Sequence, residues 1–579
     1  MSSPSPTQPS SGLLSQLTSF TRVFWIANWM EMLERLAYYG LRTVLPIYMV
    51  LSLEEGGPQF DHVQKGIIYA WWAAVQSGVP VFTGGYADRY GYKLTVAISI
   101  AIKIAGYLVM AYAVPLAASM TDGVSATVPG HSMTFTIFTA GAMLLALGTA
   151  VFKPGLQGII GTQLNKDNGS VGWSVFYQLV NVGGFLGPFL AGWMRLLAWE
   201  WVFVSCAIIV ALNYIFLFFF PEPDREMMQV INDYTGQGES GPGRVLWEST
   251  IGICEPRLMG FLVIFSGFWA MFHQLFDLLP NYIDDWIDST MVADAIARPI
   301  LGDLPAEWGG NLPQEYMINL NAGMCMLLAF LIGYLTGKVR SMTAMISGII
   351  VAAGALYSLG QTTNGWFILL AIAMFSLGEL MSSPTKMRYF NNIAPPGKKG
   401  LYLGYINATG GIGWALGSVI AGSMYEENGD KVVLARRYLT QELGQSAEAV
   451  GAMEKTAVLP KLMELTSQDA AGVRELLYTT YDPGFVWTHF ALIGLVSMIG
   501  LIIYDRITQA KVAWEAPALV VMTTLIAGWT YAGGDIQRGA TTGLIFGGLM
   551  LGYMVLEKTA PHLLPQGQGS EAGEGDASA

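Results

Sequence analysis

A group of polar residues near the start of the chain recurs at the spacing of an α-helix. The members follow the first by three, four, seven, eight and eleven positions, so one helical face carries all of them: Glu31, Glu34, Arg35, Tyr38, Tyr39 and Arg42. They lie in an apolar run, residues 23–50, that is long enough to cross a bilayer. Charges at this depth are costly unless they are paired or line a wet cavity, so this polar stripe indicates a pathway. The alternative is a salt-bridge cluster that only fastens helices together, or a helix end at the surface.

The composition places the chain among helical membrane proteins. Of its 579 residues, 53% are hydrophobic and only 12% are charged, about half the charged fraction of a typical soluble protein. Apolar runs of membrane-spanning length recur, and no alternating pattern suggests a barrel. We therefore expect an all-α polytopic membrane protein. The net charge of −12 argues against a nucleic-acid partner, and the three scattered cysteines predict neither a disulfide framework nor a metal site.

The apolar runs predict two bundles of six helices and a pair of additional C-terminal helices, about 14 transmembrane helices in all. Residues 425–483 are charged and have helical spacing, which predicts a folded extramembrane insertion. The last two apolar runs are short and Gly-rich, so twelve helices with a re-entrant pair are the alternative. The expected parts are a disordered cytoplasmic tail (1–20), an N-terminal bundle (21–220), a cytoplasmic linker (221–257), a C-terminal bundle containing the insertion (258–507), two additional helices (508–557) and a disordered acidic tail (558–579).

Lys and Arg residues predict the orientation in the membrane. They occur in the loops after the second, sixth, eighth, tenth and twelfth helices, and the loops after the first and third helices have none. By the positive-inside rule, both termini are cytoplasmic and the 425–483 insertion faces outward. The basic residues of the insertion do not oppose this prediction, because long loops are largely exempt from the rule. We expect a bacterial-type inner (plasma) membrane as the location.

Several motifs resemble those of one transporter family. Residues 83–93 resemble the loop 2–3 motif of the major facilitator superfamily, with Gly84, Asp88 and Arg89 as its cytoplasmic gate residues. The segment 31–40 resembles the Glu-x-x-Glu-Arg-Phe-x-Tyr-Tyr-Gly motif of the proton-dependent oligopeptide transporter (POT) family, with Leu in place of Phe. Further resemblances follow on helices 4, 5, 7, 8 and 10, at residues 148–154, 176–183, 268–274, 321 and 378–384.

The resemblance implies a major facilitator fold and proton-coupled import of di- and tripeptides by alternating access. A short peptide is a zwitterion, so its site needs a fixed cation for the carboxylate and a fixed anion for the amine. Arg42 and Lys153 in the first half and Glu379 in the second supply these charges, and a ligand that bridges the halves draws them together. The remaining expected binding residues offer amide groups or amphipathic walls: Asn181, Asn321, Tyr38, Tyr39 and Tyr177.

Proton coupling needs a group whose pKa depends on which partner is near. Glu31 and Glu34 beside Arg35 form such a cluster, and the resemblance makes Lys153 the partner of this cluster. The alternative for Lys153 is a lysine that snorkels at a helix end. Protons are the expected coupling ion, and we expect neither a cofactor nor a metal.

The seventh helix departs from the family pattern. It carries His273 where the family usually has a carboxylate, and Asp277 follows one turn later on the same face. We hypothesise that His273 titrates with Asp277 as its partner; the alternative is a structural histidine in a helix interface. Ser77 and Ile406 stand where the family has aromatic pocket residues, which leaves the side-chain preference of the pocket open.

Other functions remain open at this point. A family relative could carry nitrate, an amino acid or a peptide-like conjugate, and a non-transporting membrane sensor could use the insertion as its working domain. A sensor would not need charges on helices 1, 4 and 10 at facing depths. No metal-ligand spacing, nucleophile elbow or phosphate loop predicts an enzyme. We expect a monomer whose partners are small peptides or similar zwitterions and membrane lipid.

Overall fold

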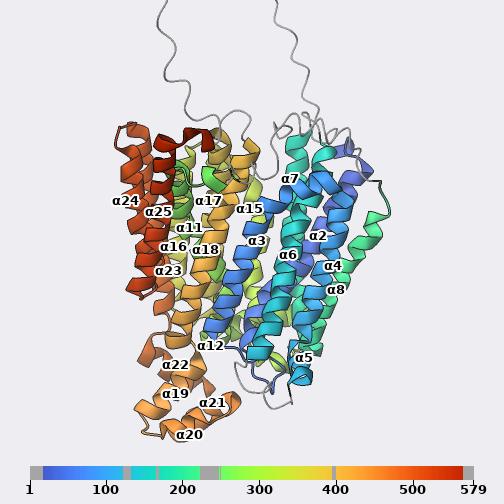
Figure 1. The fold of residues 1–579 in the computed structure, drawn as a ribbon. Coiled ribbons are helices and arrows are strands. Elements are labelled where there is room, and N and C mark those ends of the chain that lie inside the picture. The colour runs from blue at the N-terminus through green and yellow to red at the C-terminus, as the bar shows by residue number, and fades with distance from the viewer. Residues whose placement is uncertain are drawn as a thin grey trace, which may run out of the picture.

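Figure 1 shows the computed structural model, which describes residues 17–121, 132–164, 168–221, 247, 250–393 and 399–564. Within these ranges, side chains are not described for residues 81–90, 132, 169–170, 391–392 and 399–404. The expected terminal tails and the linker therefore lie largely outside the described residues. In the described part, the chain is helical and the only extended pairing is an isolated bridge between Asp288 and Asn364.

Long helices form two bundles that lie side by side in Figure 1. The first bundle contains α2 (Arg22–Val50), α3 (His62–Tyr90), α4 (Tyr92–Ala111), α6 (Ser132–Thr162), α7 (Gly169–Leu197) and α8 (Trp199–Leu217). The second bundle contains α11 (Pro256–Asp277), α15 (Gln314–Gly337), α16 (Ser341–Leu359), α17 (Gly365–Ile393), α18 (Lys399–Asn428) and α23 (Phe485–Ala510). Two additional helices, α24 (Glu515–Thr530) and α25 (Ile536–Thr559), pack beside the second bundle at its outer edge.

Ten of the described helices are long and apolar enough to cross a membrane by length and composition. The helices α2, α3 and α18 have 29 or 30 residues but are more polar, and α24 is apolar but has only 16 residues. The greater polarity of α2 comes from the stripe that the sequence predicted. The predicted all-α membrane fold, with two bundles and two additional helices, is confirmed.

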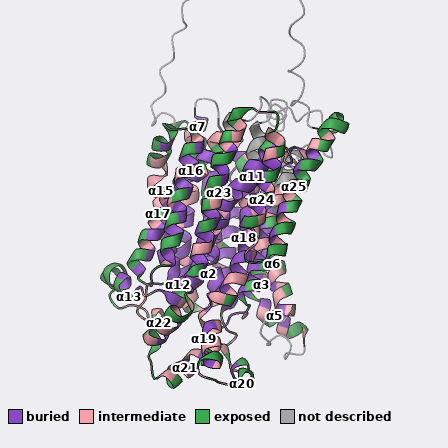
Figure 2. Ribbon diagram, turned by 90° about the vertical axis from the view of Figure 1, so that its left-hand side faces the viewer, coloured by how far each residue is buried: buried purple, intermediate pink, exposed green. Residues whose placement is uncertain are grey.

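Each bundle has its own hydrophobic core, and Figure 2 shows the buried residues running through both. In the described residues the cores are separate except at Trp414 and its neighbour Ala415 of α18, which belong to the second bundle but pack in or against the core of the first. Two bodies with separate cores can move against each other while each stays packed. Trp414 therefore marks the place where the two bundles meet.

Glycines bring the helices that carry polar residues close together. A Cβ atom at Gly187 of α7 would collide with the backbone of α2 at Leu36 and Gly40. A Cβ atom at Gly422 of α18 would likewise collide with the backbone of α3 at His62. Small residues permit this close packing of membrane helices, and so fix α2 against α7 and α3 against α18 of the second bundle.

The two ends of the bundles differ. We call one end the terminal side, where α2 begins and α25 ends, and the other the insertion side, which carries α19 (Lys431–Gln441), α20 (Ala447–Gly451), α21 (Lys455–Thr466) and α22 (Ala470–Tyr481). These four short helices enclose a small core of Leu434, Leu439, Val458, Leu462, Val473 and Leu477. The segment that follows α11, α12 (Leu279–Trp286), also lies on the insertion side.

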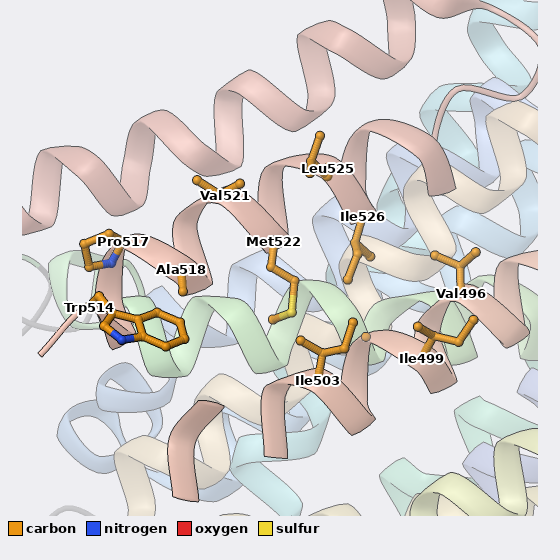
Figure 3. Close-up of a pocket in the computed structure, with 11 residues that line it drawn as sticks. Val496, Ile499, Ile503, Trp514, Pro517, Ala518, Val521, Met522, Leu525 and Ile526 are labelled. Carbon is orange, nitrogen blue, oxygen red and sulfur yellow. The ribbon is translucent and has the colours of Figure 1, made fainter. Parts of the chain in front are cut away.

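An apolar groove runs between α23 and α24 (Figure 3). Its volume is about 650 Å³, and aliphatic and aromatic side chains line it, with Trp514 at one end and Val496 at the other. Several of these side chains are exposed, among them Leu525 and Val521. Exposed apolar surface on helices of membrane-spanning bundles suits contact with lipid. The groove shares no lining residue with the polar cavity described below.

Candidate functional site

The polar stripe of α2 is buried inside the first bundle. The Arg35 Nε atom lies 3.1 Å from Glu31 Oε1, and the Arg35 guanidinium also pairs with Glu34. Glu34 has a second cationic partner, Lys103 of α4, whose ammonium also lies 4.3 Å from the centre of the Phe152 ring. Two carboxylates and two cations thus share a site in which each is less than 5% exposed. Pairing on this scale is what keeps charges tolerable at hydrocarbon depth.

Lys103 was not among the residues predicted from the sequence. A lysine inside an otherwise apolar membrane segment was the available signal. Lys153 of α6, which was predicted, is half-buried and has no carboxylate oxygen within 4.0 Å among the described residues. Lys153 is nevertheless close enough to Glu31 and Glu34 for its charge to attract theirs. Lys103 is therefore the lysine that pairs directly with the Glu31–Glu34–Arg35 cluster, and Lys153 lies near this cluster.

Arg42, at the end of the stripe, crosses from the first bundle to the second. Its guanidinium pairs with Asp277 of α11 and stacks on Tyr69 and Trp414, with its central carbon 4.2 and 4.8 Å from the ring centres. The other Asp277 oxygen accepts hydrogen bonds from Trp414 Nε1 at 2.9 Å and from Ser418 Oγ at 2.8 Å. Asp277 thus accepts bonds from both bundles, and Arg42 is neutralised in this conformation.

No hydrogen bond or ion pair joins His273 to Asp277, which bonds to Arg42, Trp414 and Ser418 among the described residues. Its ring stacks on Trp414, with centroids 4.6 Å apart and an interplanar angle of 12°. Between Leu258 and Asp277, every residue of α11 is buried except Trp269, Phe272 and His273. Because the rest of the helix is enclosed by protein, these three residues face the space between the bundles. The hypothesis that His273 titrates stays a prediction, while the structure assigns Asp277 to Arg42.

A small cavity lies between the bundles beside this patch. Its volume is about 50 Å³, well below the roughly 300–1,000 Å³ of ligand pockets. It is lined by Tyr39, Thr43, Val180, Asn181, Gly184, Pro188, Phe272, Phe276, Ile318, Asn319, Asn321, Ala322, Cys325 and Glu379. The lining combines one carboxylate with three asparagines and several aromatic rings, and it comes from both bundles. In this conformation the cavity is smaller than a ligand such as a dipeptide.

Glu379 is the anion of this cavity and is held by neutral groups. Asn321 Nδ2 donates hydrogen bonds to Glu379 Oε2 and to Ser376 Oγ, both at 2.9 Å. No Lys or Arg nitrogen of the described side chains lies within 4.0 Å of the Glu379 carboxylate. A buried carboxylate without a cationic partner is available for a positively charged ligand group.

The predicted aromatic and amide residues divide into two groups. Tyr39, Asn181 and Asn321 line the cavity, and their role in substrate binding stays a prediction. Tyr38 is buried in the first bundle, where its hydroxyl donates to Gln76 Oε1 at 3.3 Å. Tyr177 is 42% exposed, and its carbonyl accepts a hydrogen bond from Asn181 Nδ2 at 2.9 Å. Gly84, Asp88 and Arg89 lie on α3, outside the residues whose side chains are described.

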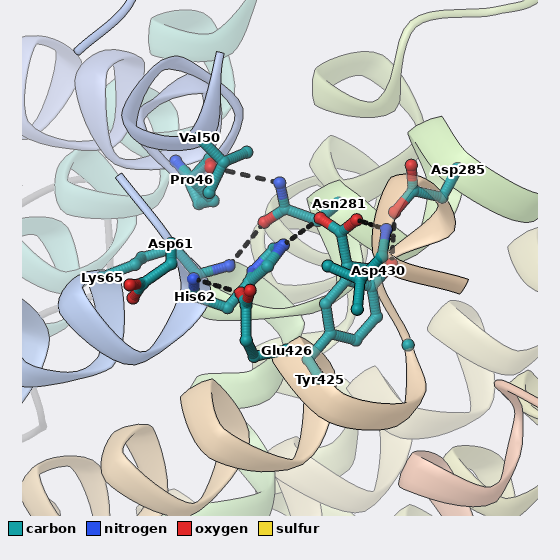
Figure 4. A network of polar contacts seen from close by, with 12 residues as sticks. Pro46, Val50, Asp61, His62, Lys65, Asn281, Asp285, Tyr425, Glu426 and Asp430 are labelled. Carbon is teal, nitrogen blue, oxygen red and sulfur yellow. Dashed lines mark hydrogen bonds and ion pairs between the residues drawn. The ribbon is translucent and has the colours of Figure 1, made fainter. Parts of the chain in front are cut away.

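A second polar network closes the insertion side (Figure 4). His62 Nε2 of α3 lies 3.0 Å from Asp430 Oδ2, at the start of α19. Lys65 Nζ donates to Asn281 Oδ1 of α12 at 2.6 Å, and Asn281 Nδ2 donates to the Pro46 carbonyl of α2 at 3.1 Å. These bonds connect the two bundles, so the insertion side is closed in this structure. The sequence did not single out His62 or Lys65.

Two carboxyl groups of this network are shifted in opposite directions. Burial, and then the charge of Asp430, raise the pKa of Asp285 in α12 to about 7, and its carboxylate accepts a hydrogen bond from Tyr425 at 2.8 Å. Burial of Asp430 would raise its pKa as well, but the His62 hydrogen bond and charge lower it below its ordinary value. The network therefore contains one carboxyl group that titrates near neutral pH.

The insertion also reaches the first bundle. Lys455 Nζ, at the start of α21, donates to the Val50 carbonyl at the end of α2 at 2.8 Å, and Thr456 Oγ1 donates to Glu54 Oε2 at 2.6 Å. On the second bundle, Arg474 of α22 pairs with Asp288 at 3.0 Å. The insertion thus contacts both bundles across the closed side.

The comparisons with known proteins define the class. The family model of the Major Facilitator Superfamily matches residues 28–418. This match covers more than half of the chain, so the chain belongs to the major facilitator superfamily. The predicted fold is that of the superfamily, and the protein is a transporter, not an enzyme.

Three bacterial transport proteins are similar in sequence to parts of this chain. The chain is 26% identical over 187 residues to the uncharacterized transporter YclF of Bacillus subtilis and 27% identical over 177 residues to the peptide transporter YePEPT of Yersinia enterocolitica. These matches cover 32% and 30% of this chain, and only 33% and 31% of the relatives. The multidrug resistance protein MdtH of Klebsiella pneumoniae is 20% identical over 421 residues, which are 71% of this chain and 88% of MdtH.

Solved structures of POT transporters share the fold. A peptide transporter POT in complex with sulfate aligns with a TM-score of 0.54 and 18% identity over 87% of this chain and 96% of that chain. A POT family transporter in complex with 5-aminolevulinic acid aligns with a TM-score of 0.56 and 14% identity over 87% and 98% of the two chains. The resemblance to the POT family seen in the sequence motifs is confirmed, and at these identities the structural likeness shows the fold alone.

Proposed function

We propose that this protein is a proton-coupled symporter that imports di- and tripeptides by alternating access. The observation that carries the proposal is the cavity between the bundles, where an unpaired carboxylate, Glu379, lies with the amides of Asn181 and Asn321. A peptide amine suits Glu379, and its backbone suits the asparagines. The carboxylate of the peptide suits Lys153, which has no carboxylate partner within the described ranges, and Arg42 once Asp277 releases it.

Proton coupling follows from the carboxylates that hold these cations. Protonation of Asp277 would remove the charge that neutralises Arg42, which weakens the link between the bundles and frees the guanidinium. Glu31 and Glu34, held by Arg35 and Lys103, form the second proton-binding cluster. His273 faces the space between the bundles and is a third candidate for titration. In this alternating-access cycle, the arrangement described above corresponds to the state that is closed on the insertion side.

We propose that the insertion side faces out of the cell and that both termini are cytoplasmic. The support is the positive-inside rule, since Arg340 and Arg257 lie on the terminal side, where they pair with Asp505 and Glu515. The closed insertion side then separates the cavity from the exterior.

Uptake into proteoliposomes tests this function. An inward proton gradient should drive accumulation of labelled dialanine, and excess unlabelled dialanine should compete with it. Glu379→Gln should abolish accumulation, because the amine loses its counter-charge, whereas Asp505→Asn, a half-buried acid on the terminal side that pairs with the exposed Arg340, should retain it. Gradient-independent or absent accumulation by the wild-type protein would contradict the proposal.

A different cargo is the second candidate. Alignment with MdtH extends over far more of the chain than alignment with YePEPT, and one structural neighbour binds 5-aminolevulinic acid. Another small zwitterion or an anion such as nitrate would use the same charged groups. Competition by amino acids or nitrate without competition by dialanine would favour this candidate.

A further inference from the structure

Lys386 of α17 is a buried cation that the mechanism above leaves without a role. It is 6% exposed, and no carboxylate oxygen lies within 4.0 Å of its ammonium among the described residues. Its ammonium donates a hydrogen bond to the hydroxyl oxygen of Thr409, at 3.3 Å. An unpaired ammonium inside a membrane-spanning helix is costly, and such residues are typically functional.

The surroundings of Lys386 open toward the substrate path. Its ammonium lies 4.0 Å from the ring centre of Trp269, one of the three residues of α11 that face the space between the bundles. Trp269 precedes Phe272, which lines the cavity, by three positions and so lies on the same helical face, one turn nearer the terminal side. The Trp269 Nε1 group is buried and has no hydrogen-bond partner in the described part of the chain. A donor without an acceptor and a cation without a carboxylate partner among the described residues thus occur together near the cavity.

The position of Lys386 relative to Glu379 fits a ligand that carries both charges. The two residues are seven positions apart on α17, which corresponds to two turns, or about 10.5 Å, on one face of the helix. Arg42 is already neutralised by Asp277 in this conformation. Glu379 of α17 is the proposed partner of the substrate's amine. A zwitterion that leaves the cavity toward the terminal side therefore meets Lys386, a cation without a carboxylate partner among the described residues, on the same helix.

We propose that Lys386 and Trp269 form an anion-binding subsite that receives the carboxylate of the substrate on the terminal side of the cavity. The subsite selects ligands with a free carboxylate over otherwise identical ligands in which it is an amide. This inference rests on the proposed function for its substrate class, because a carboxylate-bearing zwitterion is the cargo proposed there. The subsite itself rests on the geometry of Lys386 and Trp269.

The test compares ligands by thermal stabilisation of the purified, detergent-solubilised full chain at constant ionic strength. The probes are dialanine, alanyl-alaninamide, which lacks the carboxylate, and sodium acetate. Lys386→Gln should weaken dialanine binding by about 10- to 100-fold, the range expected for a lost charged hydrogen bond, and should leave alanyl-alaninamide unaffected. Lys386→Arg should retain most of the binding. The matched control is Lys338→Gln, which removes a lysine that also stacks on an aromatic ring, Tyr334, but at the exposed end of α15.

The acetate arm separates this inference from the proposed function. If wild-type protein binds acetate but no peptide, and Lys386→Gln abolishes acetate binding, the peptide function fails while the subsite stands. Equal affinity of wild type and Lys386→Gln for both acetate and dialanine would overturn the subsite. So would a wild-type protein that binds neither acetate nor dialanine. The melting temperature without ligand shows whether Lys386→Gln is folded; if it is not, Lys386→Met, which keeps the length of the side chain, replaces it and the same outcomes apply.

Discussion

Arg42 of α2 and Asp277 of α11 form a buried ion pair that joins the two bundles. Their side chains are 4% and 2% exposed, and 235 positions separate them in the sequence. Trp414 contributes to both partners, because its ring packs on the guanidinium and its Nε1 group donates to the carboxylate. The pair therefore couples the relative position of the bundles to the charge on one carboxyl group.

Asp277→Asn should destabilise the state that is closed on the insertion side. Removing one partner of a buried pair leaves the other charge uncompensated, which costs about 3–5 kcal/mol. We expect a lower melting temperature and loss of proton-driven uptake, with exchange of substrate across the membrane less affected. Asp505→Asn, at the exposed pair with Arg340, is the control. Unchanged melting and unchanged pH-dependent uptake in Asp277→Asn would contradict this role.

His273→Ala tests whether this histidine takes part in coupling. If His273 titrates, its removal should flatten the dependence of proton-driven uptake on pH, because the group that changes charge is gone. His489, which lies on α23 and stacks near Trp529, is the matched control. Full pH-dependent transport in both His273→Ala and Asp277→Asn would exclude the proposed pair as the coupling site.

Lys103 should contribute to stability through Glu34. Lys103→Met removes one of the two cations that hold this buried carboxylate, so we expect about 3–5 kcal/mol of destabilisation. The double variant Lys103→Met with Glu34→Gln should recover part of this loss, because no unpaired carboxylate remains. A double-mutant cycle from thermal or denaturant unfolding measures the coupling. A coupling energy near zero would show that Lys103 acts independently of Glu34.

Asp285 should make the closed insertion side sensitive to pH. Because the pKa of Asp285 is raised to about 7 in the closed state, this group favours closure when it is protonated. Its contribution is complete below its ordinary pKa and is lost as the pH rises through about 7. Asp285→Asn should keep the closed state populated at pH 8, as measured by distances between spin labels on α3 and α12. Closure that weakens equally with pH in wild type and variant would contradict this assignment.

Lys455 should strengthen the closed insertion side through the end of α2. A lysine that donates to a C-terminal helix carbonyl also interacts favourably with the helix dipole. Lys455→Ala should therefore raise the population of the state open on the insertion side, read from the same spin-label distances. Lys461→Ala is matched, because Lys461 lies on the same helix but pairs only with Glu464 within α21. An equal effect of both variants would indicate a general loss of insertion stability.

Local periodicity was enough to predict the polar stripe. Glu31, Glu34, Arg35 and Arg42 share one face because residues three and four apart on a helix are neighbours, whatever the rest of the chain does. Hydrophobic length likewise predicted the membrane helices and the two additional ones, since a bilayer sets the length that each must have. The motifs then pointed to the superfamily that the family model matches.

Only the tertiary structure decided which charges meet. The sequence places His273 and Asp277 on one face of α11, but Asp277 bonds to Arg42 because α2 and α11 face each other where the bundles join. In the same way, Glu34 pairs with Lys103 of α4, 69 positions away, and Lys386 has no carboxylate partner in the described part of the chain. Periodicity fixes the direction in which a side chain points along its own helix, whereas its partner depends on how separate helices pack.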